Sequence, residues 1–341
     1  MRSAERKPRP LKLRDLIRQS VRALREAGVS FGHGTTNARD EGVYLTLHAL
    51  GLPLDTSDWE LPVAARSAEK ARALVARRIK ERKPAAYLTR EAWLGDFRFY
   101  VDERVIVPRS YIAELLARDL APWIDARRIR SALDLCTGSG CLAILLAHSY
   151  PRAHVDAADL SPDALAVARR NVKAYDLGSR VTLQRSDLYC ALETQRYDLI
   201  VSNPPYVTAA AMRELPVEYR REPRVALAGG GDGLDLVRRI VREAPEHLEQ
   251  GGWLVVEVGH ARARVERAFP RLPFIWADTS GGDDCVFLIS REALAQGLAQ
   301  SAPATAAALS PRRQKAPLPA RASGAAAARR HRSARASGGS R

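Results

Sequence analysis

The sequence lacks several features that would assign it to a whole class of proteins. It has no apolar run of the roughly 18 residues that a membrane-spanning helix needs. No apolar segment follows the basic residues at its start, as one would in a secretory signal. We therefore expect no membrane anchor and no export, and we predict a cytoplasmic protein.

Cysteine is scarce, and the spacing of the few cysteines excludes the common metal and disulfide frameworks. There is no CxxC pair and no histidine cluster. We expect the histidines His33 and His48 to lie on a loop and a helix face, and we predict no metal site. The four cysteines are interpreted as reduced residues in or beside apolar segments: Cys136, Cys141, Cys190 and Cys285.

Acidic residues are missing from the end of the chain, although the whole chain carries a formal net charge of +15. From Ser301 onward there are nine Lys or Arg and no Asp or Glu. This end is rich in Ala, Ser, Pro and Gly, so residues 296–341 are predicted to form a disordered basic tail. Two interpretations stay open, contact with RNA and a merely solubilising appendage.

The first part of the chain is predicted to be helical. Apolar residues recur at helical spacing between residues 11 and 27, and either Asn37 or Arg39-Asp40 can open a second helix. We expect Ser67 to cap a third, basic helix. Residues 1–83 are therefore predicted to form an N-terminal helical domain, to which we assign substrate binding.

Residues 84–109 change period and are predicted to link this domain to the next. Alternating apolar residues on either side of Gly95-Asp96 are typical of a β-hairpin, and Val105–Arg109 reads as extended chain. Arg109 itself is open to two interpretations, a group that holds this loop over a ligand or a surface charge.

From residue 110 to 295 the pattern alternates strand and helix, which predicts an α/β fold with a parallel sheet covered by helices on both faces. The last two strands are expected to be antiparallel and to close one edge. The predicted strands are Ser131–Leu135, His154–Ala158, Arg180–Arg185, Asp198–Ser202, Trp253–Val258, Phe274–Ala277 and Cys285–Ser290.

A glycine-containing loop follows the first of these strands. Its glycines allow the backbone to approach a ligand closely, while an acid and a helix start can hold an ammonium and a carboxylate. The same residues also satisfy the dinucleotide pattern G-x-G-x-x-A, so a nicotinamide enzyme is an alternative at this point. The candidate cofactor-binding residues are Asp134, Cys136, Thr137, Gly138, Ser139 and Gly140.

Acids at two further strand ends favour a different cofactor. Asp159 can accept hydrogen bonds from ribose hydroxyls, which suits both NAD and S-adenosylmethionine. Asp187 is placed to meet an adenine amine. Acids at three successive strand ends suit S-adenosylmethionine better than NAD, and the segment that follows the fourth strand supports this choice.

That segment is Asn203-Pro204-Pro205-Tyr206. Two consecutive prolines make a stiff, non-helical turn just beyond a strand, and they fix the direction of the asparagine side chain. The turn offers two carbonyl acceptors, the Asn203 side chain and the Pro204 backbone, beside the aromatic face of Tyr206. Such a site suits a planar group that carries an NH2.

These elements together resemble the class I S-adenosylmethionine-dependent methyltransferases with an Asn-Pro-Pro-Tyr motif. This group includes adenine-amine DNA methyltransferases and protein glutamine N(5)-methyltransferases. The resemblance spans residues 10–292 and implies a Rossmann-like sheet with S-adenosylmethionine as cofactor. The segments similar to the glutamine enzymes are the hairpin, Val107–Ser110 with Glu114, Ala228–Leu234 and Glu257–His260.

Within the glutamine methyltransferases the chain is most similar to the branch that modifies large-subunit ribosomal protein L-three. Phe31–Thr35 and Glu91–Arg104 carry this similarity. The branch that modifies peptide release factors has Ile-Pro-Arg-Pro where this chain has Val107–Ser110, and glycine where this chain has Cys136. The resemblance thus implies ribosomal protein L-three as partner, with release factors or nucleic-acid adenine as alternatives.

The resemblance also implies roles at the tetrapeptide. Asn203 and the Pro204 carbonyl would accept the two amide hydrogens of a glutamine, and Tyr206 would pack against the flat amide. Pro205 completes this substrate site, and Asn203 also touches the cofactor. Glu257 is a weak candidate for a base and is expected to be structural.

Overall fold

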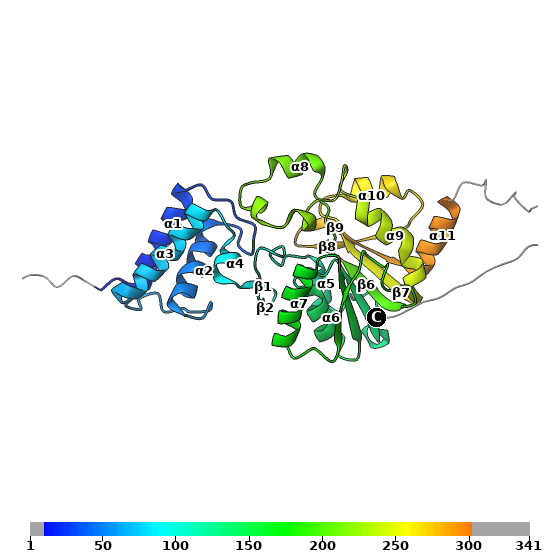
Figure 1. Ribbon diagram of the computed structural model, residues 1–341, viewed down its shortest axis with the longest axis horizontal. Helices are drawn as coiled ribbons and strands as arrows, with labels where there is room; N and C mark the ends of the chain where they lie inside the picture. The colour runs from blue at the N-terminus through cyan, green and yellow to red at the C-terminus, as the bar shows by residue number, and fades with distance from the viewer. Residues whose placement is uncertain (1–9, 302–341) are drawn as a thin grey trace, which may run out of the picture. The chain divides into compact units, whose positions relative to one another are not determined.

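Residues 10–301 are described by a computed structural model, and their main feature is a seven-stranded sheet (Figure 1). Its strand order is β5-β4-β3-β6-β7-β9-β8. The strands are β3 (Ser131–Leu135), β4 (His154–Asp159), β5 (Val181–Arg185), β6 (Tyr197–Ser202), β7 (Leu248–Glu257), β8 (Ile275–Thr279) and β9 (Gly282–Ser290).

The five strands from β5 to β7 are parallel, and β9 runs antiparallel to both β7 and β8. The predicted α/β sheet with an antiparallel closing pair is therefore confirmed. The order reverses at β3, where the chain moves first to β4 and β5 and later to β6 on the other side. Ligands of open parallel sheets bind at such a reversal, beyond the carboxyl ends of the strands.

Helices cover both faces of the sheet, each over its own hydrophobic core (Figure 1). Alternate residues of β3 show why: Ala132 packs into one core, and Leu133 and Leu135 into the other. The first core takes α5 (Ile112–Leu116), α6 (Cys141–Ser149) and α7 (Pro162–Ala174), and the second takes α9 (Asp235–His247), α10 (Arg262–Ala268) and α11 (Arg291–Ser301).

Four helices precede the sheet: α1 (Leu13–Glu26), α2 (Ala38–Leu50), α3 (Ala65–Glu81) and α4 (Ala85–Thr89). The Asn37 side chain caps α2 as expected, since it accepts hydrogen bonds from two backbone amides of the first turn. The prediction that Ser67 caps the third helix is wrong, because α3 begins at Ala65 without a side-chain cap. Burial of Ala68 and Ala71 at helical spacing stabilises this earlier start.

A short hairpin lies between these helices and the sheet. Its strands β1 (Ala92–Leu94) and β2 (Phe97–Phe99) pair antiparallel across Gly95-Asp96, as predicted. The hairpin is fixed to α7, because the Asn171 side chain exchanges hydrogen bonds with the backbone of Tyr100 at 2.8 and 3.0 Å. The boundaries proposed at residues 83 and 109 stay predictions.

The end of the described chain corrects one expectation. Helix α11 continues to Ser301, so residues 296–301, which were predicted to belong to the disordered tail, are helical. The cause is the second core, which buries Leu294 and Gly297 of α11. The predicted disorder and the RNA contact of residues 302–341 fall outside the described residues. None of the helices between residues 10 and 301 is long and apolar enough to cross a bilayer.

Candidate active site

The predicted site residues meet at the carboxyl edge of the parallel strands. Asp159 ends β4, Asn203 directly follows β6, and Asp187 lies two residues beyond β5. A cavity opens there between the strand ends, and six of the predicted residues line it: Cys136, Gly138, Asp159, Asp187, Asn203 and Pro205. The other predicted loop residues, Asp134, Thr137, Ser139 and Gly140, are not part of its wall.

Asp134 lies beneath the glycine loop and is fully buried. Its Oδ2 accepts hydrogen bonds from the Thr137 hydroxyl at 2.6 Å and from the Ala143 amide at 3.0 Å. Burial raises the pKa of this carboxyl to about 7. Its Oδ1 has no hydrogen-bond partner among the described residues. A buried oxygen without a donor fits a ligand that brings a cation or an N–H group.

The backbone of the loop turns through left-handed conformations at Cys136 (φ 61°) and Gly138 (φ 56°). Asp159 ties this loop to the next strand, since its Oδ2 accepts a hydrogen bond from the Gly138 amide at 2.8 Å and its Oδ1 accepts one from Ser161. Burial raises the pKa of Asp159. Each oxygen keeps a lone pair for a further donor, as ribose hydroxyls would require.

Asp187 lies at the exposed rim of the same cavity. Its Oδ1 pairs with Arg239 Nη1 at 2.9 Å, and its side chain is 47% exposed. The ion pair with α9 leaves Oδ2 without a partner in that contact. The structure therefore places Asp187 in the wall of the same cavity as Asp159 and Asn203.

Asn203 separates the first cavity from a second one of about 250 Å³. Asn203 and Pro205 line both cavities, whereas Pro204 and Tyr206 line only the second. The Asn203 Nδ2 donates a hydrogen bond to the Arg109 carbonyl at 3.2 Å. Because the amide nitrogen is engaged, the Oδ1 is the side-chain atom left to accept a hydrogen bond from a ligand.

Two glycine segments fit tightly around the Asn-Pro-Pro-Tyr turn. A Cβ at Gly229 would lie 2.8 Å from the Pro205 carbonyl, and one at Gly233 would lie within 2.4 Å of the Tyr206 carbonyl. A Cβ at Gly259 would lie 2.8 Å from the Tyr206 ring. Both segments therefore need glycine because the backbone and the ring of the turn pack directly on them.

Glu257 is a buried acid at the end of β7, the strand beside β6 and its Asn-Pro-Pro-Tyr turn. Its Oε2 accepts hydrogen bonds from the Ser110 hydroxyl at 2.6 Å and from the Tyr111 amide at 2.8 Å. Burial raises its pKa to about 7. These contacts hold the start of α5 against β7, which agrees with the expectation that Glu257 is structural.

An ion pair supports the wall of the second cavity. Arg109 donates to both carboxylate oxygens of Glu222 at 2.7 Å, and the Val107 amide donates to the same carboxylate at 2.9 Å. Burial alone would raise the pKa of Glu222, but the hydrogen bonds from Arg109 and the proximity of the His33 ring lower it to about 2. Arg109 is thus neither a free surface charge nor part of the first cavity's wall, and it holds the loop whose carbonyl orients Asn203.

The loop before α2 reaches this ion pair. The His33 ring is buried 4.1 Å from the Tyr219 ring, measured between centroids, and its Nε2 lies 3.5 Å from Glu222 Oε2. A Cβ at Gly32 would lie 2.1 Å from the Tyr219 hydroxyl. Gly32 and His33 therefore form a seat for Tyr219, which lines the second cavity.

A second buried ion network fixes the same segment to α2 and α3. The Arg78 side chain is fully buried, and its Nε donates to Glu41 at 2.8 Å while its Nη1 lies 3.3 Å from Glu218. Its Nη2 donates to the Ser30 carbonyl at 2.7 Å. Glu218 also pairs with Arg82 at 2.7 Å. The arginines at and just beyond the end of α3, supported by α2 and the loop before it, thus hold the segment that carries Tyr219.

One cluster in the described chain has the residue types of a metal site. His260 Nδ1 lies 2.9 Å from Asp284 Oδ1 and 3.6 Å from Cys285 Sγ. The hydrogen bond between His260 and Asp284 satisfies both groups without an ion. The expectation that the protein uses no metal stays a prediction.

The chain matches known proteins along most of its length. The family model of the methyltransferase small domain matches residues 113–219. Curated ribosomal protein uL3 glutamine methyltransferases are similar over 83% of the chain: the protein from Bordetella pertussis is 55% identical over 285 residues and 96% of its own length, and that from Burkholderia pseudomallei is 54% identical over 293 residues and 95%.

The chain belongs to this family of methyltransferases. The name uL3 denotes ribosomal protein L-three, so the resemblance stated for the sequence is confirmed at the level of the branch. The family assigns the class I methyltransferase fold and S-adenosylmethionine as cofactor. The nicotinamide alternative raised by the glycine loop is thereby excluded.

For this methyltransferase, sequence reasoning found the tetrapeptide and the strand-end acids but missed three residues. Glu222, Tyr219 and Glu218 had no predicted role, although Tyr219 lines the second cavity and the two glutamates hold the segment that carries it. His33 was interpreted as an ordinary loop histidine, yet it is buried against Tyr219 and Glu222. The sequence feature that could have indicated these contacts is Phe31–Thr35, whose two glycines and histidine support only the branch assignment in the sequence analysis.

Proposed function

We propose that this methyltransferase modifies the side-chain amide nitrogen of one glutamine in ribosomal protein uL3. The observation that carries the proposal is the position of Asn203 between two cavities, with its Nδ2 engaged and its Oδ1 left as an acceptor. The names and the 54–55% identity of the curated relatives support uL3 as the substrate.

In this proposal, the first cavity takes the cofactor. Asp134, with its unpartnered Oδ1, sits beneath the loop, and Asp159 and Asp187 line the side where ribose and adenine would lie. Cys136, Thr137, Gly138, Ser139 and Gly140 complete the loop. Bound S-adenosylmethionine supplies a methyl group on a positively charged sulfur, which is the electrophile of the reaction.

The second cavity takes the glutamine side chain. The Asn203 Oδ1 and the Pro204 carbonyl accept the two amide hydrogens, which turns the nitrogen toward the cofactor cavity. Pro205 stiffens the turn, and Tyr206 packs against the flat amide. The two acceptors stabilise the positive charge that develops on the nitrogen as it attacks the methyl carbon and the carbon–sulfur bond breaks.

No strong base is needed before the attack, because the methylated nitrogen becomes acidic and releases its proton afterwards. Glu257 is engaged with Ser110 and Tyr111, and we assign it no proton transfer. We further propose that residues 1–83 bind the protein substrate and that the enzyme acts in the cytoplasm, where ribosomal proteins are made. The basic tail is proposed to contact RNA near the substrate.

The test is transfer of labelled methyl from S-adenosylmethionine into a lysate that lacks this enzyme, with and without nuclease, followed by mass analysis. The proposal expects label on a glutamine of uL3. Label in a release factor would keep the chemistry and change the substrate. Label in adenine that is lost with nuclease would show that the tetrapeptide holds a base and not an amide.

A further inference from the structure

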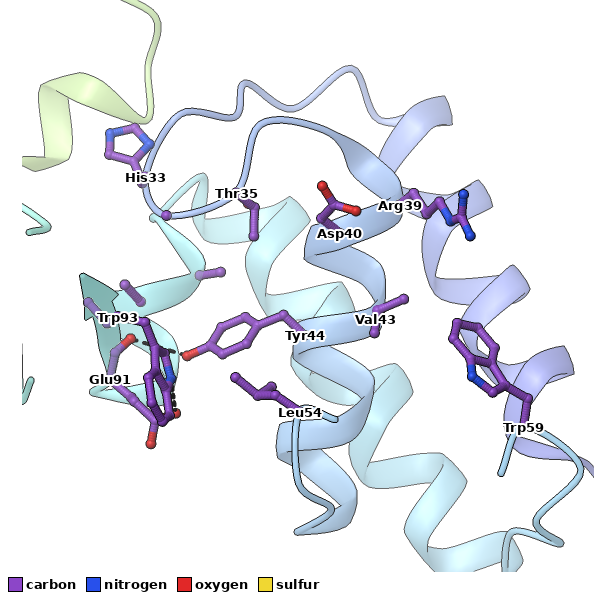
Figure 2. A pocket seen from close by; sticks show the side chains of 14 residues that line it. His33, Thr35, Arg39, Asp40, Val43, Tyr44, Leu54, Trp59, Glu91 and Trp93 are labelled. Carbon is purple, nitrogen blue, oxygen red and sulfur yellow. Dashed lines mark hydrogen bonds between the residues drawn. The ribbon is translucent and has the colours of Figure 1, made fainter. Parts of the chain in front are cut away.

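The front helices carry a groove of about 440 Å³ that the proposed chemistry does not use. It lies between the loop before α2, the exposed side of α2 and the hairpin. Figure 2 shows Tyr44, Leu54 and Trp93 gathered at one end, and Trp59 at the other end beyond Val43. Its volume is within the range of about 300–1,000 Å³ that is typical of ligand pockets.

The groove holds an unusual share of the exposed apolar surface. Six large hydrophobic side chains are exposed in the described part of the chain. Leu54, Trp59 and Trp93 line this groove, whereas Leu160 and Val225 line the cofactor cavity. Exposed apolar side chains that gather in a hollow indicate a binding surface. The proposed cofactor accounts for the apolar surface of the first cavity, but it does not account for that of the groove.

The charges of the groove distinguish between occupants. Asp40 and Glu91 line it, and Arg39 is the one Lys or Arg in its described wall. Glu91 accepts a hydrogen bond from Trp93 Nε1 at 3.0 Å, which places a carboxylate beside the indole (Figure 2). Aromatic faces beside carboxylates favour Lys and Arg side chains, and they disfavour the phosphates of a nucleic acid.

The groove is also joined to the glutamine cavity by direct contact. His33 forms part of the groove wall, and its ring packs on Tyr219, which belongs to the wall of the second cavity. A single layer of two side chains therefore connects the two hollows. A polypeptide whose glutamine enters the second cavity has its neighbouring residues close to the groove.

We infer that this groove binds the segment of the ribosomal-protein substrate that flanks the reactive glutamine, and that it takes aliphatic and basic side chains of that segment. The inference rests on the proposed function and adds a second recognition site to it. Ribosomal proteins bind RNA and are accordingly rich in Lys and Arg, which matches the carboxylates of the groove. The enzyme would then read the substrate at two places, the amide and its flank.

The test compares groove variants in steady-state transfer to purified uL3. Trp93→Ala and Leu54→Ala each remove an exposed apolar wall, and we expect the KM for uL3 to rise about tenfold for Trp93→Ala while kcat at saturation is retained. Asp40→Asn with Glu91→Gln is expected to raise KM less and to weaken its dependence on salt. An unchanged KM in Trp93→Ala overturns the inference.

Matched controls come from the same region outside the groove. Asp55→Asn changes an exposed carboxylate next to Leu54, and Asp96→Asn changes one at the tip of the hairpin. Both should keep the wild-type KM. A rise in KM for these controls equal to that of the groove variants would mean that general charge or stability is responsible, which contradicts a groove site.

Direct binding separates this inference from the proposed function. The probe is a fluorescent uL3 segment with the glutamine and its flanks, titrated with the wild-type enzyme and with Trp93→Ala and measured by anisotropy. Tighter binding by the wild type supports the groove even if no methyl transfer is seen, in which case the proposed function alone has failed. Equal binding overturns the groove alone when transfer by the wild type is normal.

Other occupants give different results. A variant that ends at Ser301 and shows a several-fold lower KM would mean that the basic tail occupies the groove. Dimers that dissociate in Trp93→Ala, measured by sedimentation, would assign the groove to a second copy. Competition by a ribosomal RNA fragment that Trp93→Ala abolishes would assign it to RNA. Each of these outcomes overturns the inference.

Discussion

The two cavities on either side of Asn203 are built in different ways. Most of the wall of the cofactor cavity comes from strand ends and the loops that directly follow them, and Arg104–Ile106 and Val225-Ala226 add two segments from elsewhere in the chain. The glutamine cavity depends on segments far apart in the chain, with His33 behind Tyr219 and Arg109 paired to Glu222. The cofactor cavity thus depends mainly on local patterns at strand ends, whereas the glutamine cavity depends mainly on long-range contacts.

The largest expected effect falls on Asn203, whose side chain offers the acceptor between the two cavities. Asn203→Ala removes the acceptor that meets the developing charge, so we expect transfer to fall by on the order of a hundredfold or more. Binding of S-adenosylmethionine should largely survive, because the loop and the strand-end acids are untouched. Single-turnover transfer and calorimetric cofactor binding measure the two effects, and transfer at the normal rate would sink the mechanism.

The next effect should be confined to the glutamine side. Glu222→Gln breaks the paired hydrogen bonds with Arg109 and leaves a largely buried cation, so the free energy of unfolding should fall by about 3 kcal/mol. Glu60→Gln is the matched control, since its pairs with Lys12 and Arg14 are exposed and should contribute little to stability. Urea denaturation compares the two variants, and equal losses of stability would contradict a larger contribution from the buried pair than from the exposed ones.

Acid should remove the same stabilisation from the wild type. The folded pKa of Glu222 is about 2, below its ordinary value of 4.5, so the unfolded state binds more protons between these values. The stabilisation is therefore fully present above about pH 4.5 and is lost as the pH falls toward 2. The difference in unfolding free energy between wild type and Glu222→Gln should shrink as the pH falls through this window. A constant difference would show that the pKa of Glu222 is not lowered in the folded state.

The cofactor side should respond in affinity and not in overall stability. Asp159→Ala removes an acceptor for ribose and for the Gly138 amide, so we expect S-adenosylmethionine to bind about tenfold more weakly. Asp278→Ala, which removes an exposed carboxylate on β8, should leave the affinity unchanged. Calorimetric titration measures both variants, and equal affinities would remove Asp159 from the cofactor site.

The smallest effect concerns the backbone of the glycine loop. Cys136 holds a left-handed conformation that glycine adopts freely, so Cys136→Gly should change the free energy of unfolding by less than about 1 kcal/mol. Cys136→Val should lower the free energy of unfolding clearly more, because a β-branched residue is least compatible with a positive φ. If both variants unfold alike, the thiol matters through its packing and not through its backbone.

The same difference in construction explains how far the sequence could predict the molecule. Strand ends, the glycine loop and Asn203–Tyr206 were predicted because each is a local pattern, and the ambiguity of the glycine loop between two cofactors was resolved by the acids and the tetrapeptide at the other strand ends. Glu218 and Glu222 were missed because their partners, Arg78 and Arg109, lie more than a hundred residues away and nothing local marks them. The start of α3 was misplaced at Ser67 for a related reason, since burial of Ala68 and not a cap determines it.

The buried pairing of Arg78 with Glu218 limits how this enzyme can be recombined. A front end taken from a relative with another target, but lacking arginines at positions 78 and 82, would leave the buried Glu218 carboxylate without a cationic partner beside the glutamine cavity. Residues 214–222 would have to travel with the front helices for such a hybrid to fold. A change of target between branches therefore requires matched changes in the front helices and in residues 214–222. These two stretches have to be exchanged together.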